Sequence, residues 1–115
     1  MVNAYDQAHS LARALKECQE YKAFLAAKER IKGKASAEQM IGDFHKRQMD
    51  LQSLVLQGKE LTQEQRDGFE KLYSVLTQDA DIKEYLIAEQ RLGTLLGDIY
   101  KIIGEAVEVD LPFAK

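Results

Sequence analysis

Cysteine, proline and tryptophan are almost missing from this 115-residue chain, which holds one cysteine, one proline and no tryptophan. The single cysteine, Cys18, cannot form an internal disulfide, which is typical of a protein in a reducing compartment. Scarce proline and abundant Ala, Leu, Glu, Gln and Lys favour helices. The sequence therefore predicts a cytoplasmic helical protein in which Cys18 is a buried or half-buried thiol.

Long apolar runs are also missing. No run approaches the ~20 apolar residues that cross a bilayer, and the first ten residues lack the charged-then-apolar order of a signal peptide. We therefore expect no membrane insertion. Apolar residues make up 45% of the chain and charged residues 30%, which indicates a folded domain rather than disorder. With no linker or repeat visible, we predict one domain over residues 1–115, with a tail from about 109.

Catalytic and metal-binding motifs are absent as well. The chain has no CxxC, no HExxH and no phosphate-binding glycine loop. Of its two histidines, His9 follows Asp6 by three residues, which places both on one helix face, but such a pair is common by chance. We expect no catalytic residue, no metal and no cofactor. The alternative, an enzyme or metalloprotein built around Asp6 and His9, requires a metal in the purified protein.

Charge is unevenly distributed. The net charge is −3, yet residues 1–35 carry seven Lys/Arg against four Asp/Glu, and residues 36–115 carry nine against fifteen. An acidic chain is a poor general binder of nucleic acid, which needs clustered cations. The one basic cluster consists of Lys28, Arg30, Lys32 and Lys34. Cations favour the last turn of a helix, which explains the cluster if the helix ends at Gly33. The alternative is a docking patch, which would make the chain a nucleic-acid accessory protein.

Apolar residues recur at helical spacing throughout, and period-two strand patterns are absent. The predicted helices cover about residues 4–17, 18–31, 36–57, 62–77 and 82–108, and the first two are either continuous or bent apart. Asn3 is the expected N-cap of the first, and Ser36 and Thr62 each precede a glutamine by three residues, as in a capping box. Asp79 or Asp81 should cap the last. The predicted fold is an all-α, elongated antiparallel helical bundle of four to five helices with a long C-terminal helix.

The last predicted helix is about as long as the whole domain should be wide, so either the single chain is an elongated bundle or the helix projects and is covered by another subunit. Some 27 residues make it about 40 Å long, whereas a compact domain of this size is about 34 Å across. Its glycines, each costing about 1 kcal/mol inside a helix, form a second seam beside an apolar stripe. We therefore predict a symmetric homo-oligomer, most simply a dimer, with a partner helix on that seam. The predicted interface residues are Glu89, Leu92, Gly93, Leu96, Gly97, Ile99, Tyr100 and Ile103.

Glu89 interrupts the apolar stripe. A carboxylate in such a place must be paired or kept neutral. We predict a contact with the "KRQ" segment, Lys46 to Gln48, that helps to fix helix register. The alternatives are exposure at the edge of the stripe and a ligand-binding role.

Several stretches together resemble a known family. They are "AYDQAHSLARALKECQEYKAF", "SAEQMIGDFHKRQMDLQ", "GKELTQEQ" and "EYLIAEQRLGTLLGDIYKIIGEAV". The chain resembles the YlbF/YmcA family of small helical bacterial proteins, and most closely its YheA-like branch, whose members have no assigned activity. The resemblance covers about residues 4–107 and is a whole-chain pattern without a catalytic motif.

The resemblance implies long antiparallel helices that assemble into dimers or tetramers. Better-known members are non-enzymatic subunits of a cytoplasmic complex that influences RNA processing by a membrane-attached endoribonuclease, and through it competence, biofilm formation and sporulation. The implied partners are a second copy, other family members and ribonuclease machinery. Those members can hold an iron–sulfur cluster through cysteines, but Cys18 alone cannot supply four thiolates. The predicted function is a non-catalytic, self-associating helical adapter or regulator.

Overall fold

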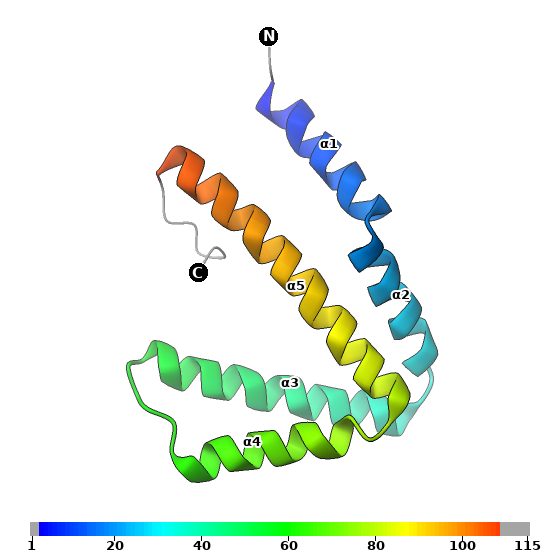
Figure 1. Ribbon diagram of the computed structural model, residues 1–115, viewed down its shortest axis with the longest axis vertical. Helices are drawn as coiled ribbons and strands as arrows, with labels where there is room; N and C mark the ends of the chain where they lie inside the picture. Colours follow the sequence, from blue (N-terminus) through cyan, green and yellow to red (C-terminus); the bar gives the residue numbers. More distant parts are fainter. Residues whose placement is uncertain (1–2, 109–115) are drawn as a thin grey trace. The chain divides into compact units, whose positions relative to one another are not determined.

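The computed structural model describes residues 3–108, which contain five helices and no strand. The helices are α1 (Ala4–Glu17), α2 (Gln19–Ile31), α3 (Ala35–Leu56), α4 (Gln63–Leu76) and α5 (Ala80–Val107) (Figure 1). The predicted all-α class, with five helices and a long C-terminal one, is confirmed. The predicted tail from about 109 lies outside the described residues.

Contacts within the chain gather it into two compact units. The first consists of the described parts of residues 1–28 and 85–115, and therefore holds α1, most of α2 and most of α5. The second consists of residues 29–84 and holds α3 and α4. The prediction of a single domain over residues 1–115 stays a prediction.

One residue separates α1 from α2. Asn3 caps α1 as predicted, because its side-chain oxygen accepts a hydrogen bond from the Tyr5 amide at 2.8 Å. Cys18 adopts an extended conformation, with φ −74° and ψ 154°. Its amide donates to the Leu15 carbonyl and its carbonyl accepts from the Lys22 amide. Cys18 therefore ends α1 and begins α2, and its thiol is free and half-buried, as predicted.

The start of α3 differs from the prediction. Gly33 ends the preceding helix with φ +83°, a conformation that glycine adopts without a Cβ clash. The chain then turns at once, so α3 begins at Ala35 with Lys34 as its N-cap. The Glu38 carboxylate accepts a hydrogen bond from the Gly33 amide at 3.2 Å. The predicted capping role of Ser36 is therefore wrong, because Ser36 lies inside the first turn.

An antiparallel hairpin of α3 and α4 forms most of the second unit (Figure 1). Gly58, with φ +82°, follows the end of α3. The predicted capping box at the start of α4 is confirmed. Thr62 accepts from the Gln65 amide at 3.0 Å, and the Gln65 side chain accepts from the Thr62 amide at 2.9 Å.

The core of the second unit lies at one end of this hairpin. The Phe44 ring is stacked 5.0 Å from Phe69, and the other buried side chains of this unit are Ile31, Ala37, Ile41, Leu76 and Ile82. The Tyr73 ring lies 5.9 Å from the Phe44 ring, although Tyr73 is 39% exposed. Apolar residues near the far end of α3, such as Val55 and Leu56, are exposed.

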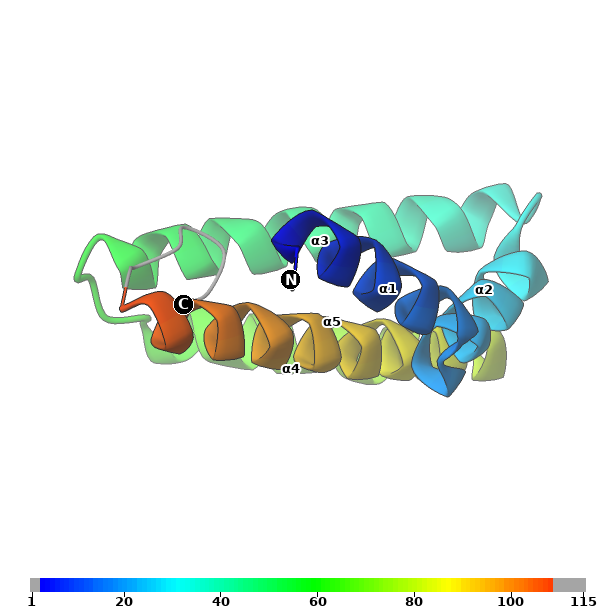
Figure 2. The same ribbon diagram turned by 90° about the horizontal axis from the view of Figure 1, so that it is seen from above.

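The first unit contains α1, α2 and α5, with α1 antiparallel to α5 in both views (Figures 1 and 2). Its buried side chains are Ala27, Tyr85, Leu86 and Ala88. The Phe24 ring of α2 lies 5.5 Å from the Tyr85 ring of α5. No side chain of α1 is buried, so its apolar face has little cover.

The two serine and threonine caps that the sequence predicts give a matched test. Thr62→Ala should lower the free energy of unfolding by about 1 kcal/mol, because it removes the acceptor for the Gln65 amide. Ser36→Ala should change it by less than about 0.5 kcal/mol, since Ser36 lies within the first turn of α3. Urea unfolding followed by circular dichroism measures both. Equal losses in the two variants would contradict the assigned caps.

Candidate self-association surface

The apolar stripe of α5 is buried at its start and uncovered at its end. Asp79 caps the helix, because its carboxylate accepts from the amides of Asp81 and Ile82 at 2.9 and 3.1 Å. Burial extends to Ala88, which is 7% exposed. Further along, Leu92, Leu96 and Ile99 are half-buried. The last turns expose Ile102 (65%), Ile103 (42%) and Val107 (58%).

Two of the glycines in α5 face open space. A Cβ placed on Gly93 or Gly97 would meet no atom within 4 Å, apart from the helix's own backbone. Gly104, two turns beyond Gly97, is buried. No close contact within residues 3–108 requires a glycine at 93 or 97, although each makes the helix less stable than an alanine would. A reason for these two glycines therefore has to come from outside the chain, or they are simply tolerated.

Glu89 is half-buried and hydrogen-bonded within its own helix. Its partner is Tyr85, one turn earlier, whose side chain is only 8% exposed. Burial raises the pKa of the Tyr85 phenol to about 12, and the nearby Glu89 carboxylate adds to the rise. The (i, i+4) spacing of the two residues was a signal for this bond, which the sequence prediction missed. The predicted contact of Glu89 with Lys46–Gln48 stays a prediction.

The eight predicted interface residues lie on one continuous side of α5. Successive residues of a helix are about 100° apart, so positions 89, 96, 100 and 103 fall along the middle of this side. Leu92 and Ile99 flank it on one edge, and Gly93 and Gly97 on the other. Their role in self-association stays a prediction. What is observed is that none of the eight is fully buried.

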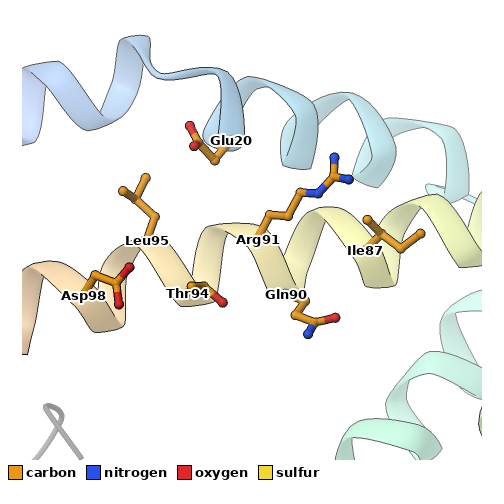
Figure 3. A pocket seen from close by; sticks show the side chains of 7 residues that line it. All are labelled: Glu20, Ile87, Gln90, Arg91, Thr94, Leu95 and Asp98. Atoms are coloured by element: carbon orange, nitrogen blue, oxygen red, sulfur yellow. The ribbon is translucent and has the colours of Figure 1, made fainter.

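A groove runs between α2 and another side of α5. It has a volume of about 530 Å³ and is open to solvent. Figure 3 shows Glu20 extending from α2 toward α5, and Arg91 and Leu95 extending from α5 toward α2. The remaining lining residues are Ile87, Gln90, Thr94 and Asp98. Mixed charges and open walls do not define one ligand class, and the sequence prediction did not find this groove.

The basic cluster is partly neutralised inside the second unit. Lys34 lies 2.6 Å from the Asp81 carboxylate, and Arg30 forms an ion pair with Glu84. The hydrogen bond with Asp81 raises the pKa of Lys34, and the same bond lowers the pKa of Asp81. Two of the four cations of the predicted docking patch therefore already have acidic partners. Lys28 and Lys32, both exposed, complete the patch.

Other chemistry has no visible support in residues 3–108. No group of three or more His, Cys, Asp or Glu side chains in this range could hold a metal ion. Asp6 and His9 are both exposed on α1. Within the same residues, no buried side-chain nitrogen or oxygen lacks a hydrogen-bond partner. None of the helices in this part of the chain is both long and apolar enough to cross a bilayer.

The raised pKa of Tyr85 predicts a loss of stability at high pH. Folding raises this pKa from 10.0 to about 12, so the folded state holds its proton more tightly. The resulting stability is complete below pH 10 and is lost as the pH rises from 10 to 12. Tyr85→Phe should therefore flatten the fall in unfolding free energy over this range, as measured by urea unfolding at several pH values.

The matched control is Tyr5→Phe, which removes a phenol that is 79% exposed. This control should keep the slope of the wild-type protein. A Tyr85→Phe slope equal to the wild-type slope would contradict the burial of the phenol.

Comparison with known proteins places the chain among bacterial relatives of the same length. A UPF0342 protein of Symbiobacterium thermophilum is 77% identical over 111 residues, which cover 96% of this chain and 99% of the relative. A UPF0342 protein of Caldicellulosiruptor saccharolyticus is 45% identical over 109 residues, with 95% and 91% covered. A third, from Clostridium novyi, is 37% identical over 109 residues, with 95% and 96% covered.

One family profile matches nearly the whole chain. It is described as "Control of competence regulator ComK, YlbF/YmcA" and matches residues 4–108. This range includes all five helices and the entire candidate surface on α5. The resemblance seen in the sequence is thereby confirmed, and the chain belongs to the YlbF/YmcA family.

Proposed function

We propose that this protein is a non-catalytic helical adapter that binds a second copy of itself and acts within a regulatory assembly. One observation carries the proposal: apolar residues of α5 continue to Val107, whereas the last side chain of this helix that is fully buried is Ala88. Exposed aliphatic side chains in a row are unfavourable in water and mark interaction surfaces. The proposed interface is the side of α5 that carries Leu96, Gly97 and Ile103.

Energetics support a second copy. Complete burial of an aliphatic side chain contributes about 1.5–3 kcal/mol, so covering the exposed parts of Ile103 and Val107 contributes roughly half of that for each. A twofold dimer doubles every such contribution, because each contact occurs twice. Such a dimer would also explain the glycine at position 97, since the absence of a side chain there lets the backbone of the second copy approach closely.

The regulatory part of the proposal is supported by the family. Its description names control of the competence regulator ComK. An adapter works through surfaces rather than through a reactive centre, which accords with a chain whose most prominent feature is an uncovered helix face. On the family resemblance, we place the protein in the cytoplasm, in an assembly that affects RNA processing. The proposal of no enzymatic activity rests on the same regulatory description.

Self-association is tested by filling the space at Gly97. Gly97→Leu should reduce the mass measured by size-exclusion chromatography with light scattering from a multiple of 13.1 kDa to 13.1 kDa. A Cβ at Gly97 would meet no atom of residues 3–108 within 4 Å apart from the helix's own backbone, so folding should survive. Gly42→Leu, at another helical glycine with open space, is the control and should leave the mass unchanged. An oligomer that survives Gly97→Leu would contradict the proposed surface.

The regulatory role is tested by affinity capture from a lysate of the source bacterium, followed by mass spectrometry. The wild-type chain should retain ribonuclease components or other members of its family, at least tenfold above Gly97→Leu if assembly depends on self-association. Equal recovery with both variants would separate the adapter role from self-association. Recovery of the chain alone would contradict the adapter role.

A further inference from the structure

The uncovered part of α5 has the spacing of a coiled-coil seam. Alternating steps of four and three along one helix side define what we call the distal seam: Glu89, Gly93, Leu96, Tyr100, Ile103 and Val107. This seven-residue repeat suits packing against one other helix. The buried side chains that precede the seam on this helix side are Tyr85 and Leu86, at 8% and 6% exposure. It spans 19 residues, or about 28 Å.

The distal seam complements itself in size when it is reversed. A twofold axis at the level of Asp98 would place each residue opposite the one equally far beyond 98 in the second copy. Gly93 then faces Ile103, and Leu96 faces Tyr100. The large side chain of Ile103 thus fills the space that Gly93 leaves. Glu89, half-buried and hydrogen-bonded to Tyr85, lies at the end of the seam, in the polar rim that interfaces commonly have.

The flank of the distal seam allows the two helices to come close. Gly97 lies one residue from the axis, so the two copies of Gly97 share one flank and are about 3 Å apart along the helices. Apart from the helix's own backbone, a Cβ at Gly97 would meet no atom of residues 3–108 within 4 Å, so the chain leaves room at this position. Small residues on both sides of an axis permit close backbone contact, whereas a large side chain would separate the helices.

Other pairings of two α5 helices fit less well. Moving the axis by half a heptad toward the start of the helix would require Ile82 and Leu86 as contacts, but the chain already buries both, at 1% and 6% exposure. A parallel pair would set Gly93 opposite Gly93, leaving a gap, and Ile103 opposite Ile103. It would also bring the two acidic helix ends, each with Glu105 and Glu108, side by side next to unsatisfied carbonyls.

We propose that a second copy of this chain covers the distal seam with its own distal seam, in antiparallel orientation, about a twofold axis at the level of Asp98. This inference rests on the proposed self-association and adds its orientation and register. It follows from the reversed size match of Gly93 with Ile103 and from the burial of the alternative contacts.

Cysteine cross-linking of the full-length chain tests the register. In a Cys18→Ser background, Gly93→Cys and Ile103→Cys are prepared separately, mixed, allowed to exchange subunits and oxidised. The antiparallel register places the two cysteines at the same level, within reach of a disulfide. Two copies of Gly93→Cys would instead lie about 15 Å apart along the helices. The mixture should therefore cross-link at least ten times faster than either variant alone.

The control is Asp98→Cys, at the level of the axis but on the opposite side of α5, which should not cross-link. Rapid cross-linking of Gly93→Cys with itself would overturn the antiparallel orientation. Absence of cross-links in a sample that light scattering shows to be dimeric would overturn the register and leave self-association intact. A mass of 13.1 kDa for the Cys18→Ser protein would overturn the proposed function itself.

If Ile103→Cys does not fold, the register can be tested instead by exchanging the sizes of the side chains at positions 93 and 103. Gly93→Leu alone should weaken self-association at least tenfold, because the new side chain meets Ile103 of the second copy. Adding Ile103→Ala should restore most of the loss. Failure of the second change to restore association, with folding verified by circular dichroism, would overturn the register.

Discussion

The apolar stripe of α5 extends over 28 residues, and the chain buries only its first part. Nearly every functional inference about this protein depends on that mismatch. Burial of Ile82, Leu86 and Ala88 anchors the start of the helix, whereas Ile103 and Val107 remain 42% and 58% exposed in the folded single chain. Because apolar surface in water is unfavourable, the uncovered part of α5 is the place where a partner gains most by binding.

Local signals in the sequence predicted the helices well, and distant contacts less well. Asn3, Thr62 with Gln65, and Gly58 mark helix ends because their effects are local hydrogen bonds and backbone conformations. Ser36 failed although it has the same spacing, since the turn at Gly33 started the helix earlier. A capping residue and a neighbouring turn can each set the start of a helix, and the sequence pattern alone does not show which of them does so.

The spacing of apolar residues predicted which face of each helix is apolar, but not how much of that face the fold buries. The apolar face of α1 has the regular spacing of a buried face, yet α1 buries none of its side chains. On α5, the same spacing continues past the point where burial ends. Glu89 was correctly identified as needing a partner, but a hydrogen bond to Tyr85 depends on ring burial that one sequence does not reveal. The groove lined by Glu20 and Arg91 likewise depends on how two distant helices meet.

Membership of the YlbF/YmcA family sets the regulatory context, and the uncovered helix supplies a physical means of assembly. The most direct test is sedimentation equilibrium of the wild-type protein over a dilution series from about 100 μM to 1 μM. Our account predicts a mass that approaches twice 13.1 kDa at the high end and falls on dilution. A mass of 13.1 kDa at every concentration would contradict it.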